Sequence, residues 1–148
     1  MNGYGAKAYQ RVGLDTGVSS ADPHQLILML YDGVLEAVRV GQAAMAAGDI
    51  AAKGSALGKA VRIVDEGLKA SLDRNSGGPL SFRLLDLYGY ITMRLLQANL
   101  RNDQAAMAEV TGLLGELRGA WAQIRPGSAG VGTPELNVSR SGRFAVAA

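Results

Sequence analysis

The chain has 148 residues, of which 48% are hydrophobic, a length and composition that suit one domain with a buried core. It has no cysteine and one histidine, His24, so a disulfide, a thiolate metal site and any site with two imidazoles are excluded. The formal net charge is +2, aromatic residues are 5% of the chain, and no apolar run approaches the roughly 18–20 residues of a membrane span, so base stacking on nucleic acid and membrane insertion are not expected.

The small positive charge lies at the end of the chain. Between residues 23 and 124 basic and acidic side chains are equally numerous, whereas Arg125, Arg140 and Arg143 outweigh the acidic residues that follow. A neutral body lacks the basic face that phosphate binding requires, which argues against a nucleic-acid partner. The first residues have no apolar segment of the secretory-signal type, so we expect a cytoplasmic protein.

The first helix is predicted over residues 23–46. Asp22 precedes Pro23, and Gln25 follows three residues after the aspartate, which is a capping-box pattern with proline at the first helical position. Gly48 then supplies the residue type that ends helices in the left-handed conformation. No proline interrupts the chain from residue 24 to residue 78.

A second helix, 49–73, is predicted to start at Asp49 and to end before the loop sequence Asn75–Pro79. Ser81 is a candidate N-cap for a third helix, 81–101. A tight turn at Asn102–Asp103 leads into a fourth helix, 103–125, which Pro126 ends.

Short connections make neighbouring helices antiparallel, and no strand-like alternation competes with this pattern. The predicted fold class is therefore all-α, an antiparallel up-down-up-down four-helix bundle. The predicted organisation is a flexible N-terminal arm (1–21), the bundle (22–125) and a disordered C-terminal tail (126–148).

Glycines are frequent inside the predicted helices and lower the expected stability of the bundle. They indicate either close approach of neighbouring helices or the compositional drift of an alanine- and glycine-rich proteome, and we favour drift. The nine positions are Gly33, Gly41, Gly54, Gly58, Gly67, Gly89, Gly112, Gly115 and Gly119.

Two helices carry more apolar surface than a bundle needs. In helix 23–46 the apolar residues sweep an arc of roughly 200°, whereas a bundle helix needs somewhat over 100°. Helix 81–101 has two apolar stripes, of which the core needs one. The surplus is explained either by a helix wedged between neighbours or by a groove for an apolar partner helix. The stripes of helix 81–101 are Leu84, Tyr88, Ile91, Leu95 and Ala98, and Phe82, Leu85, Met93, Leu96 and Leu100.

Polar groups among the apolar ones favour an interface. Tyr31, Tyr88 and Tyr90 combine apolar area with a hydroxyl; the alternative is a bundle-edge position with the hydroxyl in water. Arg94 can hydrogen-bond a peptide backbone or pair with Asp86. For Asn99, capping of the turn after this helix is favoured over a peptide contact.

No catalytic pattern is found. His24 is expected to be solvated in the first helical turn, and a di-iron bundle would need more histidines than one. Phosphate-loop and nucleophile-elbow motifs are missing from the sequence. We therefore expect neither an enzyme nor a cofactor or metal site.

Several segments resemble one known family. The stretch 22–33 (DPHQLILMLYDG) looks like the first-helix motif of the FliS flagellar secretion chaperones. Residues 87–90 (LYGY) and 94–103 (RLLQANLRND) are similar to the third helix and its turn, and 116–121 (ELRGAW) to the fourth helix. Tyr4 and Tyr9 resemble the N-terminal arm of the family. With these two tyrosines, the resemblance covers about residues 4–124, in order and at compatible spacing.

The resemblance implies a bundle that binds the disordered C-terminal segment of flagellin in the cytoplasm. It would prevent premature polymerisation and deliver flagellin to the gate of the flagellar type III secretion apparatus. Tyr4 and Tyr9 would belong to an arm that covers part of the site when flagellin is absent. Gly89 and Met93 stand where the family often has charged residues. The residues implied in or beside the binding region are Tyr31, Leu87, Tyr88, Tyr90 and Arg94, and the surplus apolar arcs add Leu28, Leu35 and Met93.

Other functions remain open on the sequence. The extra stripes can meet each other in a homodimeric structural bundle, which requires a dimer without flagellin. A carrier of a small apolar ligand would have an enclosed cavity instead of an open groove. A regulator that sequesters an anti-sigma factor or a translational regulator would use the same kind of groove.

Overall fold

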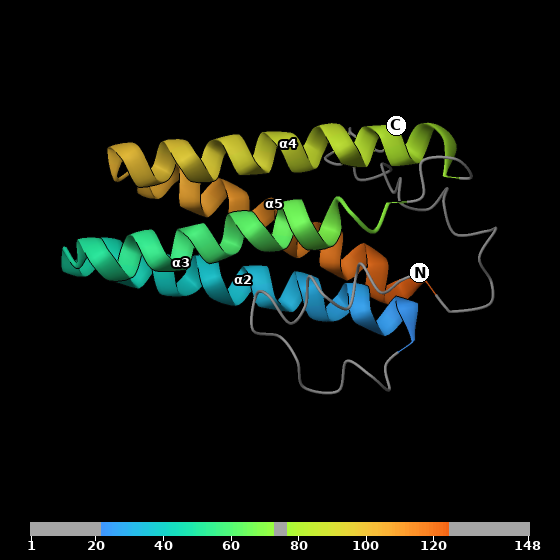
Figure 1. The fold of residues 1–148 in the computed structure, drawn as a ribbon, viewed down its shortest axis with the longest axis horizontal. Helices are drawn as coiled ribbons and strands as arrows, with labels where there is room; N and C mark the ends of the chain where they lie inside the picture. Colours follow the sequence, from blue (N-terminus) through green and yellow to red (C-terminus); the bar gives the residue numbers. More distant parts are fainter. Residues whose placement is uncertain (1–21, 73–76, 125–148) are drawn as a thin grey trace.

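The computed structural model describes residues 22–72 and 77–124, and within them the chain is helical with no strand. The predicted arm, the predicted tail, and Tyr4 and Tyr9 lie outside the described residues. The π-helical segment η2 continues α3, so the described chain forms four helical rods, as predicted. The elements in Figure 1 are α2 (Pro23–Ala47), α3 (Ile50–Arg62), η2 (Ile63–Leu68), α4 (Gly78–Arg101) and α5 (Gln104–Gln123).

Short-range capping defines most helix ends. The carboxylates of Asp22, Asp49 and Asp103 each accept a hydrogen bond from the backbone N–H three residues further on, at 2.7, 3.0 and 3.1 Å. Gly48 and Asn102 end α2 and α4 in the left-handed conformation, with φ of 74° and 54°. These starts and stops agree with the sequence prediction to within one or two residues.

The start of α4 was predicted wrongly. Ser81 does not cap this helix but lies buried inside it, because α4 already begins at Gly78. Pro79 is tolerated in the first turn, where a backbone N–H has no helical partner anyway. The helix therefore gains one turn beyond the predicted N-terminus.

The second helix also differs from its prediction. Its α-helical part ends at Arg62, and the π-helical turn that follows is marked by a hydrogen bond from Lys69 N–H to the carbonyl of Val64, at 2.8 Å. Within this turn Gly67 lies against α2, since a Cβ added there would be only 2.7 Å from Leu30 Cδ2. For this glycine, close approach of two helices is the correct interpretation and compositional drift is wrong.

The helices form an up-down-up-down bundle (Figure 1). α2 packs against α3 and α5, and α4 packs against the same two helices, so α2 and α4 lie on opposite corners. Gly41 of α2 allows the close α2–α3 contact, because a Cβ there would lie 2.6 Å from Leu57 Cδ2.

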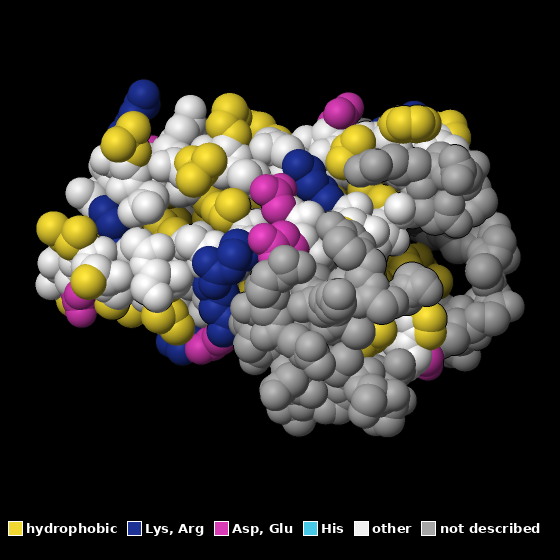
Figure 2. Space-filling model, in the orientation of Figure 1, with side chains coloured by type: hydrophobic (Ala, Val, Ile, Leu, Met, Phe, Trp, Pro, Cys, Tyr) yellow, Lys and Arg dark blue, Asp and Glu magenta, His cyan; other side chains and the backbone are white. Residues whose placement is uncertain are grey.

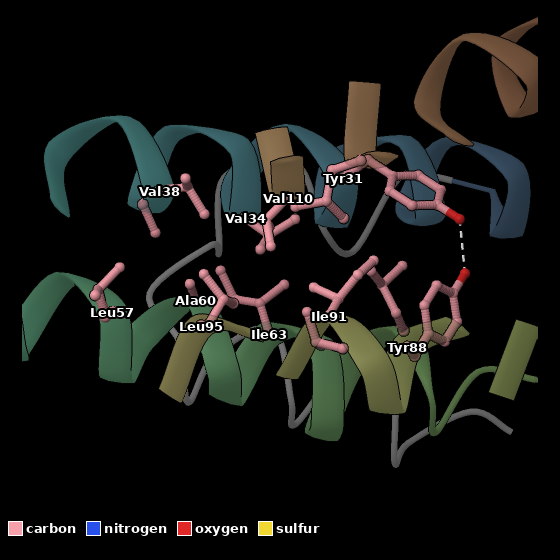
Figure 3. Close-up of a cluster of buried hydrophobic side chains, with 14 of the residues drawn as sticks. Tyr31, Val34, Val38, Leu57, Ala60, Ile63, Tyr88, Ile91, Leu95 and Val110 are labelled. Atoms are coloured by element: carbon pink, nitrogen blue, oxygen red, sulfur yellow. Dashed lines mark hydrogen bonds between the residues drawn. The ribbon is translucent and has the colours of Figure 1, made fainter. Parts of the chain in front are cut away.

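The core runs along the bundle axis between the four helices (Figure 3). It is built of aliphatic side chains with almost no exposed area, plus two tyrosines. Fully buried side chains from each rod include Val34, Val38, Leu57, Ile63, Ile91, Leu95, Val110 and Leu114.

Candidate partner-binding surface

The two apolar stripes of α4 have opposite environments. Tyr88, Ile91, Leu95 and Ala98 of the first stripe are buried in the core. The second stripe, which we call the outer stripe, faces solvent, and side chains of this type follow α4 along the upper edge of the molecule in Figure 2. Its members are Phe82 (56% exposed), Leu85 (half-buried), Met93 (45%), Leu96 (55%) and Leu100 (80%).

The outer stripe is the largest group of exposed bulky apolar side chains in the described part of the chain. Only Val40, Ile50 and Tyr90 join its four exposed members in that class. Exposed apolar side chains that follow one another along one face of a helix form a candidate binding surface. The wedged-helix explanation is therefore wrong for α4.

On α2 the predicted surplus is smaller. Leu28 and Leu35 are half-buried, and Leu35 packs against the core cluster. Among the exposed bulky apolar side chains of the described residues, α2 supplies only Val40, at 39%. Most of the 200° arc is thus taken up by packing within the monomer.

Tyr31 and Tyr88 lie inside the core, not at a bundle edge. They are 3% and 2% exposed, and their hydroxyls hydrogen-bond each other at 2.6 Å across the α2–α4 diagonal (Figure 3). Burial raises the pKa of Tyr88 to about 12 and raises the pKa of Tyr31 well above its usual value. The alternative with the hydroxyls in water is wrong for this pair.

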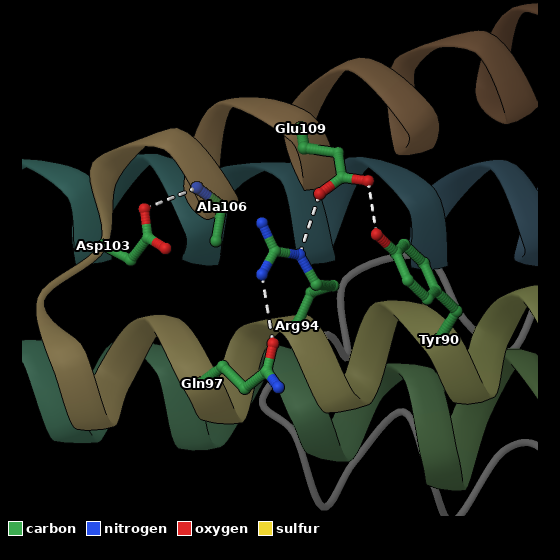
Figure 4. Close-up of polar contacts among 6 residues, drawn as sticks. All are labelled: Tyr90, Arg94, Gln97, Asp103, Ala106 and Glu109. Carbon is green, nitrogen blue, oxygen red and sulfur yellow. Dashed lines mark hydrogen bonds and ion pairs between the residues drawn. The ribbon is translucent and has the colours of Figure 1, made fainter.

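Tyr90 and Arg94 are placed beside the outer stripe, on the α5 side of α4 (Figure 4). The Tyr90 hydroxyl donates to Glu109 Oε2 at 2.5 Å, and Arg94 Nε donates to Glu109 Oε1 at 2.8 Å. Arg94 Nη1 also donates to Gln97 at 3.0 Å. The expected alternative pairing of Arg94 with Asp86 is wrong, because Glu109 of the neighbouring helix takes the guanidinium.

The contacts among Tyr90, Arg94 and Glu109 shift the pKa values of these side chains. The hydrogen bond to Glu109 raises the pKa of Tyr90, and the same bond lowers the pKa of Glu109. The groups are solvent-exposed, so the ion pair orients side chains without adding much stability. Glu109 was not a predicted site residue; the sequence placed it only on the polar side of the fourth helix, with no sign that it faces Tyr90 and Arg94.

Leu87 is half-buried and packs against the core cluster. At about 100° per residue, it lies next to Arg94 on the helix, on the side toward the buried stripe. Tyr90 and Arg94 thus lie together on the α5 side of α4, whereas Met93 belongs to the outer stripe and Leu87 lies toward the core. The structure does not bring Tyr31 or Tyr88 to the same surface.

His24 has a structural position that the sequence did not predict. Its Nε2 lies 2.9 Å from the Trp121 carbonyl oxygen, Trp121 Nε1 donates to the His24 carbonyl at 3.0 Å, and the rings stack at 5.1 Å. The expectation of a solvated imidazole is wrong, since the ring fastens the start of α2 to the end of α5.

Lys53 is a second unpredicted contact. It is only 7% exposed, and its ammonium donates to the Asn99 carbonyl at 2.9 Å and to Asn102 Oδ1 at 2.6 Å. A cation at the carboxyl end of α4 is also favoured by the helix dipole. The residue holds α3 to the α4–α5 turn.

No group of three or more metal-ligating side chains is found in residues 22–72 and 77–124. No helix in these ranges is long and apolar enough to cross a membrane.

Comparison with known proteins shows that the chain matches one protein family. The model of the family "Flagellar protein FliS" matches residues 5–128. The chain is 51% identical over 122 residues to the flagellar secretion chaperone FliS of Salmonella typhimurium. The aligned region covers 82% of this chain and 90% of that protein. It is 42% identical over 119 residues to the Escherichia coli FliS (80% and 88% covered) and 37% identical over 131 residues to that of Bacillus subtilis (84% and 93%).

Proposed function

This chain belongs to the FliS family of flagellar proteins, and on that premise we propose that it is a cytoplasmic export chaperone for flagellin. It binds the disordered C-terminal segment of flagellin, prevents premature polymerisation and delivers the subunit to the flagellar type III secretion apparatus. It acts by binding, without catalysis or a cofactor.

The observation that carries the proposal is the outer stripe of α4. Met93 and Leu96, near its middle, are 45% and 55% exposed, so roughly half of each side chain stays available to a partner. A disordered segment that folds on such a strip buries apolar area on both sides of the contact.

Binding is coupled to folding of the flagellin segment. Ordering the segment costs free energy, and burial of apolar surface repays it. At about 25 cal/mol per Å², a contact on the order of 1,000–2,000 Å² leaves enough free energy for tight binding after that cost. Release does not need a nucleotide, since the export machinery takes over the segment.

Tyr90 and Arg94 supply the polar border of this surface. Glu109 holds both side chains at the α4–α5 boundary, where donors of the guanidinium can meet carbonyl oxygens of the bound segment. Leu87 and Leu28 and Leu35 are further proposed contacts. Tyr31 and Tyr88 act indirectly, because their hydroxyl pair fixes α2 and α4 relative to each other.

Calorimetric titration with a synthetic peptide of the flagellin C-terminal segment tests the proposal. We expect binding with a large negative heat-capacity change, and Met93→Ser with Leu96→Ser should weaken it at least about tenfold. Val40→Ser is the matched control, because Val40 is also an exposed apolar residue but is not a proposed contact. At about 100° per residue, it lies roughly 120–140° around α2 from Leu28 and Leu35. No binding by the wild type, or a heat-capacity change near zero, would contradict the proposal.

The N-terminal arm is proposed to compete with flagellin for this surface. Deleting residues 1–16 should leave the helical fold intact and raise the association rate or the affinity for the peptide. Loss of folding on that deletion would refute the competing role. Circular dichroism and stopped-flow fluorescence measure the two outcomes.

A further inference from the structure

The outer stripe has a gap at its centre, and the gap is Gly89. Members of the stripe follow one another at helical steps of three or four residues, apart from the interval between Leu85 and Met93. Gly89 falls in that interval, four residues from each. A Cβ added at Gly89 would meet no heavy atom within 4 Å. The strip therefore lacks one side chain in its middle and the space there is open; we call this position the hollow.

Nothing within the described monomer requires a glycine at this position. Gly41 and Gly67 are needed for packing, because a Cβ there would approach a leucine to 2.6 and 2.7 Å. Gly48 and Gly78 take positive φ, which favours glycine. Gly89 has neither property, although glycine in the middle of a helix lowers its stability. Gly54, Gly58, Gly112, Gly115 and Gly119 share this lack of a packing or backbone requirement, but Gly89 is the one that lies within the outer stripe.

The length and spacing of the strip suit a helical occupant. Apolar positions separated by three and four residues form the seam along which two helices pack. From Phe82 to Leu100 the strip is about 27 Å long at 1.5 Å per residue, which is about five helical turns. An open strip of this length on a convex helix surface does not enclose a small ligand as a cavity would.

We propose that Gly89 is a specificity-determining residue: its hollow, between Leu85 and Met93, accepts one bulky apolar side chain from a helical part of the flagellin C-terminal segment. The inference rests on the proposed function and deepens it, because it names the position on α4 that selects the size of a flagellin side chain. A leucine, isoleucine, methionine or phenylalanine fills the hollow, and any side chain at position 89 excludes it.

The test compares substitutions at Gly89 with the same substitutions at Gly112. Gly112 is exposed in α5, and a Cβ added there also meets no heavy atom within 4 Å. Gly89→Ala and Gly112→Ala should both raise the thermal midpoint, by about 4 °C or more, because each removes a helix-interior glycine without a clash. Binding of the synthetic flagellin peptide is then measured for the same proteins.

Affinity should separate the two positions. Gly89→Leu should weaken peptide binding at least about tenfold, and Gly89→Ala by a smaller factor, although both variants are stably folded. Gly112→Ala and Gly112→Leu should bind like the wild type. Unchanged binding by Gly89→Leu, or an equal loss from Gly112→Leu, would overturn the inference while the proposed function stands. No binding by the wild type would instead remove the proposed function.

Alanine substitution along the peptide identifies the side chain that enters the hollow. One bulky apolar position should lose at least about tenfold in affinity for the wild type and much less for Gly89→Leu, which is a coupling between the two sites. A scan with no such position would contradict the inference. Sedimentation provides a further check: a wild-type dimer that Gly89→Leu dissociates, with peptide binding unchanged, would assign the hollow to a second copy and overturn it.

Discussion

The buried hydroxyl pair of Tyr31 and Tyr88 gives a sharp test of how the bundle is held together. Both side chains are at most 3% exposed, and no other hydrogen bond is found for either hydroxyl in the described part of the chain. Tyr31→Phe or Tyr88→Phe leaves one buried hydroxyl without its partner, at a cost of about 1–3 kcal/mol in the free energy of unfolding. The double substitution removes both polar groups and should be nearly neutral.

The assay is urea denaturation of the four proteins, followed by circular dichroism and by the fluorescence of Trp121. Each single variant should lower the midpoint at unchanged m-value, and the double variant should recover most of the loss. Tyr90→Phe is the control, because its hydroxyl bonds Glu109 at the surface and should change stability by at most about 0.5 kcal/mol. Additive losses, with the double variant as unstable as the sum of the singles, would refute the reasoning.

The same pair predicts the alkaline limit of stability. The pKa of Tyr88 is about 12 in the folded protein, against about 10 in an unfolded chain, because burial disfavours the phenolate. This contribution, about 3 kcal/mol for two pKa units, is fully present below pH 10 and is lost as the pH rises to 12. The variant with both Tyr31→Phe and Tyr88→Phe should lose less free energy of unfolding between pH 10 and pH 12 than the wild type. An equal loss in the two proteins would mean that other groups cause the alkaline destabilisation.

Two further substitutions test other contacts. Lys53→Met keeps the apolar part of the side chain but removes the hydrogen bonds to the Asn99 carbonyl and to Asn102. In urea denaturation it should lower the free energy of unfolding by about 1–3 kcal/mol. An unchanged midpoint would show that these hydrogen bonds make no net contribution to stability. Gly67→Ala places a Cβ 2.7 Å from a Leu30 methyl carbon. In thermal unfolding it should lower the free energy of unfolding by about 1–3 kcal/mol. A stabilising effect would mean that the π-helical turn moves to accommodate the methyl group.

The all-α class and most helix ends could be predicted because their causes lie within a few residues. An aspartate that caps a helix needs only the N–H three residues further on, as Asp49 and Asp103 show. Gly48 ends α2 through its own backbone conformation. The start of α4 was missed because both a serine cap and a proline in the first turn were locally acceptable, and Ser81 proved to be buried.

The candidate site could be predicted only as a surplus of apolar surface on α4. Two stripes at helical spacing look alike in the sequence, and burial of Ile91 and Leu95 by the neighbouring helices decided which one remained outside. The arginine partner was missed for a related reason: Arg94 pairs with Glu109, a residue on another helix that no local spacing connects to it.

The sequence by itself determined the helices, their order, their antiparallel succession and the presence of more apolar perimeter than four rods can hide. Only the tertiary structure decided that Tyr31 meets Tyr88 in the core, that His24 stacks on Trp121, and that the outer stripe stays open. The physical reason is the separation along the chain between the residues that interact. Capping and periodicity act within one or two turns, whereas burial depends on side chains that are 57 or 97 residues apart in the chain and meet only when the helices pack.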